Sequence, residues 1–278
     1  MHSLRWLISQ TLREDIGNED ITTNRTVPSD TRCHVRLVAK QAGVLSGITA
    51  FRMVFDCVKA RPAKWHALSN GDTFNKGDVV ASFEGNARAV LTGERTAMNF
   101  VQHLSGVATV TAEYVARVAG LNVRICDTRK TTPMLRKLEK DAVVHGGGSN
   151  HRHNLSDGIL IKENHIVAAG GITKAVQNLR HGVHHLMKIE VEVTNFAELE
   201  EALEAGADAI LLDNMSLDDM RAAVQRVRGN HRVMLEASGN ASLERVRAMA
   251  ETGVDVISVG ALTHSAPIVD LSLLIESA

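Results

Sequence analysis

The stretch MKIEVEVTNFAELEEALEAGADAILLDN, residues 187–214, decides the fold. It begins with MKIEVEV, in which Ile and Val alternate with Glu, and it ends with an apolar run, AILLDN. Between them lies an amphipathic segment that begins at Asn195, which has N-cap spacing to Glu198, and stops at Gly206. The order strand, helix, strand predicts a parallel βαβ unit.

The same pattern recurs along the chain from about residue 120. Ser216 and Ser242 are predicted to begin further helices, and Gly229 and Gly253 to stop them. Continuous apolar strands that alternate with helices predict a parallel sheet covered on its outer face, closed or nearly closed into an α/β barrel of about six or seven strands. The other predicted strands are NVRICDT (122–128), GILIK (158–162), RVMLEAS (232–238) and VISVGA (256–261).

Residues 1 to about 110 have a different, mixed α/β pattern. CHVRLVAK (33–40) and GDVVASFEG (77–85) alternate as strands do, and a long helix is expected from about Thr92 to Tyr114. The start of the chain, MHSLRWLISQTLREDIG, has helical spacing and differs from the continuous apolar run of a signal peptide. NGDTFNKGDVVASFEG has a superficial likeness to lipoyl and biotinyl carrier domains, but Lys76 stands in a polar turn, which disfavours a carrier.

Composition limits the partners of this chain. Its 278 residues are 44% hydrophobic, enough for a large core in one or two domains. The 31 Lys and Arg nearly balance the 32 Asp and Glu, and aromatic residues make up 3%, so we expect no nucleic-acid and no membrane partner. The three cysteines form no C-x-x-C pair, and no run approaches transmembrane length, which favours a cytoplasmic protein.

Polar residues gather where the predicted strands end. The parallel strands of a β/α barrel direct their carboxyl ends to one rim, where catalytic loops lie. A single charged residue at a strand end commonly just meets water, but every predicted strand brings a polar residue here, so we expect one common pocket. In chain order these residues are Asp127, Arg129, Lys130, Lys162, Glu190, Glu192, Asp213, Glu236, Ser238, Ser258 and Gly260.

Basic residues outnumber acidic ones between Arg129 and Lys162. Arg129 and Lys130, and also His151 and Arg152 in the loop GGGSNHRHN, lie in loops or at strand ends, where they suit carboxylates and phosphates. A zinc site built from the nearby histidines is an alternative, but their spacing fits neither H-E-x-x-H nor a structural zinc pattern.

The remaining basic residues of this region belong to a predicted helix. Thr132 and Pro133 supply a cap and a first-turn proline for MLRKLEKDAVV. Acidic residues interleave with the basic ones there, so we expect a solvent-facing surface that carries Arg136, Lys137 and Lys140.

The opposite side of the predicted mouth is acidic and glycine-bearing. Glu192 and Asp213 stand on adjacent predicted strands and suit Mg²⁺ together with substrate phosphates; ion pairs with the lysines are the alternative. The loops ASGNAS and SVGALTHS present backbone N–H groups that suit a terminal phosphate. Together these features indicate phosphoribosyl transfer to an acidic acceptor, without covalent catalysis.

The motifs taken in order resemble those of a known family over nearly the whole chain. They are EDIGNEDITT, ERTAMNFVQHLSGVAT, DTRKTTPMLRKLEKDAVVHGGGSNHR, LSDGILIKENHI, EVEV, ILLDNM, EASGN and ETGVDVISVGALTHS. The sequence resembles the quinolinate phosphoribosyltransferases, also called nicotinate-nucleotide pyrophosphorylases (carboxylating).

The resemblance implies an N-terminal α/β sandwich domain (1–112), onto which residues 267–278 pack back, and an α/β barrel domain (113–266). It further implies a homodimer in which Arg95 of one subunit reaches the active site of the other. The implied reaction joins quinolinate and phosphoribosyl pyrophosphate with loss of carbon dioxide, in NAD biosynthesis.

The resemblance also assigns roles to individual residues. The implied catalytic residues are Lys130, Lys162, Glu192 and Asp213. Of these, Glu192 and Asp213 would bind Mg²⁺ and the ribose. Many relatives have two glycines after the EAS serine, whereas Asn240 follows Gly239 here, which leaves the contact of Asn240 open. The implied groups for quinolinate and for phosphate oxygens are Arg95, Thr128, Arg129, Lys130, His151, Arg152 and Lys162, and those for the 5′-phosphate are Ser238, Gly239, Asn240, Gly260 and Ala261.

Three other functions stay open from the sequence. A related scaffold acts on a monocarboxylate base without decarboxylation, as in nicotinate phosphoribosyltransferase or the molybdenum-operon homologue, although the TRK, NHR and LIKENH strings disfavour this. A Schiff-base aldolase would use Lys162 as its nucleophile. A non-catalytic binding protein would not need the full set of charged groups.

Overall fold

The computed structural model describes residues 3–230 and 232–277, and the chain forms two compact units. The N-terminal unit contains the residues up to Ala112, Thr132–Gly147 and the residues from Ser265 onward. The barrel unit contains Glu113–Thr131 and Gly148–His264. The segment Thr132–Gly147 therefore groups with the N-terminal unit, although both of its neighbours in the chain belong to the barrel unit.

The N-terminal unit is built on a four-stranded sheet in the order β12-β1-β5-β3, with β1 antiparallel to both of its neighbours. A two-stranded sheet joins β2 and β4. The strands are β1 (Arg32–Ala39), β2 (Gly43–Val44), β3 (Ala63–Ala67), β4 (Thr73–Phe74), β5 (Val79–Asn86) and β12 (Leu271–Ser277). The helices are α1 (Leu4–Ile16), α2 (Ile21–Thr26), α3 (Ile48–Cys57), α5 (Arg136–His145) and α4 (Ala87–Arg117), which continues into the barrel unit from Glu113.

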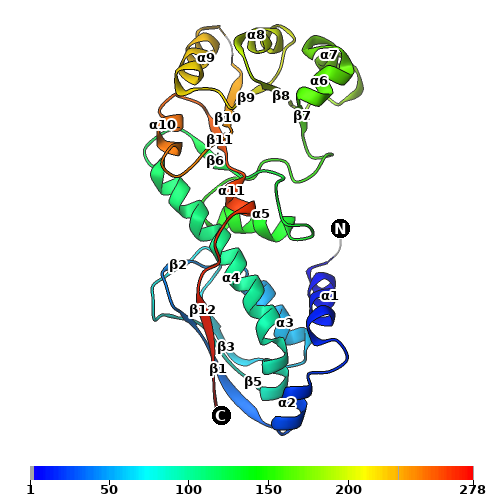
Figure 1. Ribbon diagram of the computed structural model, residues 1–278, viewed down its shortest axis with the longest axis vertical. Helices are drawn as coiled ribbons and strands as arrows, with labels where there is room; N and C mark the ends of the chain where they lie inside the picture. The colour runs from blue at the N-terminus through cyan, green and yellow to red at the C-terminus, as the bar shows by residue number, and fades with distance from the viewer. Residues whose placement is uncertain (1–2, 231, 278) are drawn as a thin grey trace. The chain divides into compact units, whose positions relative to one another are not determined.

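Alternation along β1 gives this unit one buried sheet face. Cys33, Val35, Leu37 and Ala39 are buried, and α3 and α4 lie along this sheet in Figure 1. Aromatic rings of α3 join the helices to the sheet; for example, the ring centroids of Phe55 and Phe83 lie 4.9 Å apart. The predicted strands and helices of the first half are confirmed, and the long helix is longer than expected at both ends.

The helix predicted from Thr132-Pro133 begins later and differs from the expectation. Residues before Arg136 form a turn, and the backbone N–H of Thr132 donates to Glu139 Oε2 at 3.0 Å. Glu139 and Lys140 are both fully buried, so the prediction that Lys140 faces solvent was wrong. Glu139 also lies 2.8 Å from His103 Nε2. Tertiary packing with α4 within this unit therefore overrides the charged pattern of the helix.

The barrel unit contains a six-stranded sheet in the order β6-β11-β10-β9-β8-β7, and all of its pairs are parallel. All six predicted strands are confirmed. They are β6 (Arg124–Cys126), β7 (Ile159–Ile161), β8 (Ile189–Val193), β9 (Ala209–Asp213), β10 (Met234–Ser238) and β11 (Val256–Ser258). The helices, which surround the strands in Figure 1, are α6 (Glu163–Ala169), α7 (Ile172–Gly182), α8 (Phe196–Glu204), α9 (Leu217–Asn230), α10 (Val246–Ala250) and α11 (Ala261–His264).

The barrel is open between its first and last strands in the described part of the chain, where no ladder joins β6 to β7. A single parallel bridge extends the sheet on this side, because Ser149 pairs with Cys126 of β6. Ser149 N–H donates to the carbonyl of Ile125 at 2.8 Å, and Asp127 N–H donates to the carbonyl of Ser149 at 3.1 Å. The chain after the glycine run thus lies beside β6 as a one-residue strand.

The helix boundaries of the barrel unit follow the predicted caps only in part. Asn195 accepts from Glu198 N–H, and Ser216 Oγ accepts from Asp219 N–H at 3.1 Å, as predicted. Helix α10 begins four residues after Ser242, because a turn precedes it. Gly229 lies within α9 rather than ending it.

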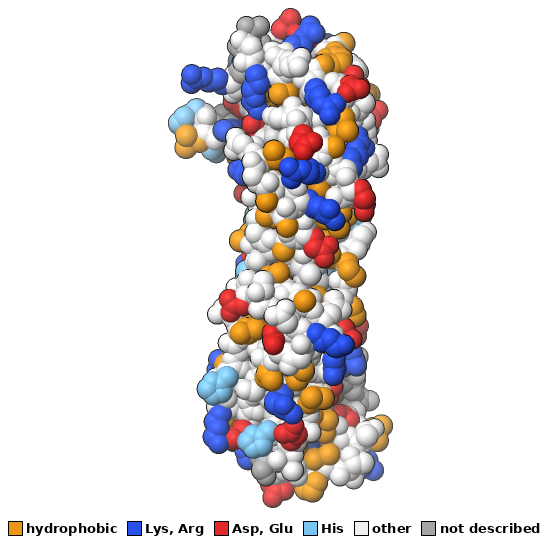
Figure 2. Space-filling model, turned by 90° about the vertical axis from the view of Figure 1, so that its left-hand side faces the viewer, with side chains coloured by type: hydrophobic (Ala, Val, Ile, Leu, Met, Phe, Trp, Pro, Cys, Tyr) orange, Lys and Arg blue, Asp and Glu red, His pale blue; other side chains and the backbone are white. Residues whose placement is uncertain are grey.

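The described surface carries mixed charge. On the face drawn in Figure 2, Lys and Arg side chains are interspersed with Asp and Glu. Among the described helices, none has the length and apolar character needed to cross a lipid bilayer.

A close approach inside the N-terminal unit provides a test of this packing. A Cβ added at Gly106 of α4 would lie 2.0 Å from the carbonyl oxygen of Pro267, so Gly106→Ala should lower the free energy of unfolding by about 1–3 kcal/mol. The matched change Gly229→Ala in α9 meets nothing within 4 Å and should raise it by up to about 1 kcal/mol. Urea unfolding measures both, and equal effects would contradict the packing.

Candidate active site

The strand register of the barrel unit sorts its side chains into two faces. Ile189, Val191 and Val193 of β8 are fully buried, whereas Glu190 and Glu192 between them point to the other face. In the ladders, Glu192 and Glu236 are both paired with Leu211, so these three side chains lie in one layer on the same face. Ser238 is paired with Asp213, one layer nearer the carboxyl end. Carboxylates from three strands therefore share one side of the sheet.

The loop that carries His151 is fixed to the end of β6. Asp127 is fully buried and accepts a hydrogen bond from His151 N–H at 2.9 Å through Oδ1. The Ser149 bridge holds the same loop two residues earlier. Backbone contacts to one strand thus set where the His151 and Arg152 side chains begin.

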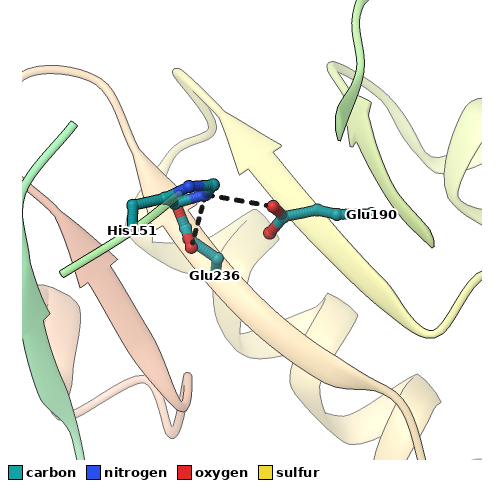
Figure 3. Close-up of side chains that lie close together, drawn as sticks. All are labelled: His151, Glu190 and Glu236. Carbon is teal, nitrogen blue, oxygen red and sulfur yellow. Dashed lines mark hydrogen bonds and ion pairs between the residues drawn. The ribbon is translucent and has the colours of Figure 1, made fainter. Parts of the chain in front are cut away.

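The His151 imidazole points at two carboxylates from other strands (Figure 3). Its Nε2 atom lies 3.1 Å from Glu190 Oε2 and 3.7 Å from Glu236 Oε2. The side chain of Glu236 is only 5% exposed, and its Oε1 atom is buried without a hydrogen-bond partner among the described residues. We call these three residues the histidine–carboxylate cluster.

Burial changes the proton affinity of Glu236. It raises the pKa of this carboxyl group from 4.5 to about 7, and the negative charge of Glu190 acts in the same direction. The charge of Lys162 and a hydrogen bond from Ser258 oppose this rise in pKa, as does His151 whenever its imidazole is protonated. Near neutral pH the cluster therefore holds fewer negative charges than its two carboxyl groups would have in water.

Two guanidinium groups influence each other at this end of the barrel. Burial lowers the pKa of Arg152, and the positive charge of Arg129 lowers it further, while Glu190 opposes. Arg152 Nη1 donates to the carbonyl of Gly158 at 2.8 Å, which holds part of its fork. Two cations that repel each other attract an anion that neutralises both.

Other predicted residues form three local groups, the first two of which involve Lys162 and Lys130. Lys162 Nζ makes an ion pair with Glu192 Oε2. At Lys130, the carbonyl accepts from Thr263 Oγ1 at 2.8 Å, and the side-chain stem lies so close to Gly260 that a Cβ there would be 3.1 Å from its Cδ. The TRK loop and the loop after β11 are therefore packed together.

A third group lies after β9 and β10. Asn214 N–H donates to the carbonyl of Ser238 at 3.0 Å, and Asn214 Nδ2 donates to Asp213 Oδ2 at 2.9 Å. Gly239 has φ +89°, and a Cβ there would lie 2.1 Å from Asn214 Oδ1, so only glycine fits this turn. Asn240, at φ +50°, directs its amide toward the same oxygen at 3.5 Å.

Not all predicted residues meet in this unit. Arg95 lies exposed on α4 in the N-terminal unit. Thr128 Oγ1 accepts from Lys130 N–H at 3.0 Å, which bends the TRK loop, and Ala261 is the first residue of α11. Sequence reasoning missed Asn214, the burial of Glu236 and the inward direction of Glu190; the IEVEV alternation was the available signal for Glu190.

The donor sets differ in the cation they suit. In the described residues, the one group of three or more ligating side chains within 4.8 Å is the histidine–carboxylate cluster. Glu192 and Asp213 provide only oxygen donors, which fits Mg²⁺ held partly by substrate phosphates.

Of the histidines considered for a zinc site, His145 belongs to the N-terminal unit. There its Nδ1 lies 2.8 Å from Ser46 Oγ, and burial lowers its pKa.

Comparisons with known proteins agree over the whole chain. The family model "Quinolinate phosphoribosyl transferase, N-terminal domain" matches residues 20–105, and the corresponding C-terminal model matches residues 107–274. A probable nicotinate-nucleotide pyrophosphorylase [carboxylating] of Bacillus subtilis is 41% identical and covers 97% of this chain and 92% of that protein. The crystal structure of NadC from Streptococcus pyogenes has a TM-score of 0.92 at 41% identity and covers 98% of this chain and 96% of that one. The crystal structure of nicotinate-nucleotide pyrophosphorylase from Ehrlichia chaffeensis has a TM-score of 0.93 at 40% identity and covers 99% of both chains.

The raised pKa of Glu236 predicts a pH dependence of stability. Because its folded pKa of about 7 exceeds the ordinary 4.5, its contribution to stability is complete below pH 4.5 and is lost as pH rises through 7. Wild type should thus lose on the order of 3 kcal/mol more than Glu236→Gln between pH 4.5 and 8. Urea unfolding of both proteins across this range measures the difference, and parallel profiles would refute the assignment.

Proposed function

The chain belongs to the quinolinate phosphoribosyltransferase family, and we propose on that premise that it transfers the phosphoribosyl group of phosphoribosyl pyrophosphate to quinolinate. The products are nicotinate mononucleotide, pyrophosphate and carbon dioxide, a step of NAD biosynthesis.

The observation that carries this proposal is the presence of two guanidinium groups at this end of the barrel, where the positive charge of Arg129 lowers the pKa of the partly buried Arg152. Quinolinate has two adjacent carboxylates, and two arginine forks are suited to bind both. A monocarboxylate base would neutralise only one of them. Lys162, whose ammonium is already paired with Glu192, adds a third cation on the neighbouring strand end.

The phosphate groups have their own candidate contacts. We assign the 5′-phosphate to the turn of Ser238, Gly239 and Asn240 and to the start of α11 at Gly260 and Ala261. Lys130 packs closely against Gly260, which supports a role for both in phosphate binding. The lysine ammonium would add positive charge beside the backbone N–H donors at the start of α11. Thr128 holds the loop that presents Lys130.

Glu192 and Asp213 would hold Mg²⁺. Their carboxylates lie one layer apart on the same face of adjacent strands, and both are partly exposed, which fits a cation that retains water and phosphate ligands. When bound, Mg²⁺ neutralises charge on the pyrophosphate. In its absence Lys162 supplies the counter-charge of Glu192.

The protein groups then act in a defined order. Arg129 and Arg152 orient quinolinate so that its ring nitrogen attacks the anomeric carbon as the bond to pyrophosphate breaks. Lys130 and Lys162 stabilise the negative charge that develops on pyrophosphate. The ring nitrogen is now quaternary, so it accepts the electron pair released when the adjacent carboxylate leaves as carbon dioxide, and a proton replaces that carboxylate.

The same contacts bear on the rival functions. A Schiff-base aldolase needs a neutral lysine amine, whereas the Lys162 ammonium is ion-paired with Glu192. The exposed side chain of Arg95 suits the proposed homodimer, in which it would complete the site of the partner subunit. A cytoplasmic location agrees with cysteines that form no disulfide in the described residues.

Direct assay tests the reaction. Incubation with quinolinate labelled in the carboxylate adjacent to nitrogen, phosphoribosyl pyrophosphate and Mg²⁺ should give equal amounts of nicotinate mononucleotide and labelled carbon dioxide. Removal of Mg²⁺ with a chelator should abolish turnover. Nucleotide formation from nicotinate, without carbon dioxide release from quinolinate, would instead support the monocarboxylate rival.

The role of Arg152 is tested by substitution. Arg152→Ala removes one of the two forks and should raise the KM for quinolinate by about 100-fold, since a charged hydrogen-bonded contact contributes about 1.5–3 kcal/mol. The KM for phosphoribosyl pyrophosphate should change much less. Arg221→Ala, which removes an exposed arginine of α9 paired with Asp218, is the matched control and should leave both constants unchanged. Unchanged quinolinate kinetics in Arg152→Ala would rule out its assigned contact.

A further inference from the structure

Both ring nitrogens of His151 are engaged by the protein itself. Nδ1 accepts a hydrogen bond from Arg152 N–H at 2.7 Å, and Nε2 lies 3.1 Å from a Glu190 carboxylate oxygen and 3.7 Å from one of Glu236. A nitrogen that accepts a hydrogen bond carries no proton, so the ring proton is on Nε2 and points at the two carboxylates. In this orientation neither nitrogen is directed at a substrate.

This tautomer also disfavours a metal ion at the cluster. A metal bound to Nε2 would need the lone pair of that atom, and the other ring nitrogen of a metal-bound histidine normally donates its N–H. Here the other nitrogen accepts instead. The Oε1 atom of Glu236 is buried without a partner among the described residues, and burial and the negative charge of Glu190 favour the neutral acid there.

We propose that Glu190 and Glu236 are positioning residues that fix the His151 ring, and that this ring in turn fixes the backbone from which Arg152 reaches the substrate. This inference rests on the proposed function, in which Arg152 binds a quinolinate carboxylate. It gives His151 a different role from the direct substrate contact that the sequence resemblance implied.

The connection from the carboxylates to Arg152 consists of short contacts. Glu190 and Glu236 stand on rigid strands, and their side chains hold Nε2 from β8 and β10. The opposite ring atom accepts the N–H of Arg152, and the N–H of His151 is held by Asp127. The Arg152 fork is then anchored at its far end by the Gly158 carbonyl. A ring that rotated would release the hydrogen bond at the start of this arginine.

Kinetics can separate positioning from direct contact. Glu236→Leu removes the carboxyl group that faces His151 Nε2 from β10 and should lower kcat/KM for quinolinate by about 10- to 100-fold, as expected when a substrate group is displaced by about 1 Å. His151→Ala should lower it by a similar factor, and the double variant should be no worse, because both changes break the same connection. The KM for phosphoribosyl pyrophosphate should stay within about twofold in every variant.

Two control variants accompany these measurements. Glu236→Gln retains an oxygen at the position that faces His151 Nε2 at 3.7 Å, so it should restore most of kcat/KM. Glu204→Leu makes the same chemical change as Glu236→Leu at an exposed position of α8 and should have no effect. A loss in His151→Ala that adds to that of Glu236→Leu would indicate that the imidazole contacts quinolinate itself, and would overturn the proposal.

A spectroscopic measurement tests the arrangement without substrate. Long-range ¹H–¹⁵N spectra of histidine-labelled protein, with the His151 signals identified by their loss in His151→Ala, should show the proton on Nε2 in wild type. A proton on Nδ1 would overturn the proposal, as would Zn²⁺ binding that calorimetry detects in wild type and not in Glu236→Gln. Absence of mononucleotide formation by wild type would overturn the proposed function instead, and the spectra would still report on the ring.

Discussion

The parallel register of β8, β9 and β10 is the constraint on which the site depends. It pairs Glu192 and Glu236 with the same residue, Leu211, and therefore brings two acidic side chains into one layer inside the barrel unit. A shift of one residue in the strand register would turn each side chain to the opposite face of the sheet. These carboxylates would then point to the face that now holds the fully buried apolar side chains. The loops at the carboxyl ends then have to supply positive charge for them.

The carboxylates at this end of the barrel differ in burial. Glu236 is buried and holds its proton more strongly than a carboxyl group in water, while Glu192, in the same layer but partly exposed, makes an ion pair with Lys162. Burial and the positive charge of Arg129 lower the pKa of Arg152, and in the proposed function these two guanidinium groups bind the dianionic substrate. Glu190 and the buried Glu236 thus contact the protein's own histidine, whereas Glu192 and Asp213 are the carboxylates assigned to Mg²⁺ in the proposed function.

Local sequence patterns predicted helices and strands well where these elements follow a regular periodicity or a cap spacing. The six strands of the barrel unit and the Asn195 cap were predicted because periodicity and N-cap spacing are properties of neighbouring residues. Lys140 was wrongly expected in solvent, because its burial is decided by packing within the N-terminal unit. For the same reason, no local sequence pattern predicts that Thr132–Gly147 groups with that unit.

The sequence by itself determined the parallel α/β architecture, the family resemblance and the set of polar residues at the strand ends, because alternation and motif spacing are written along the chain. Only the tertiary structure decided what those residues face. His151 and Glu190 are 39 positions apart, and their contact follows from a bridge at Ser149 and from strand order, which no spacing along the chain specifies. The burial of a side chain and the residues that it contacts are properties of the folded barrel. They distinguish the residues proposed to bind substrate from the residues proposed to position these.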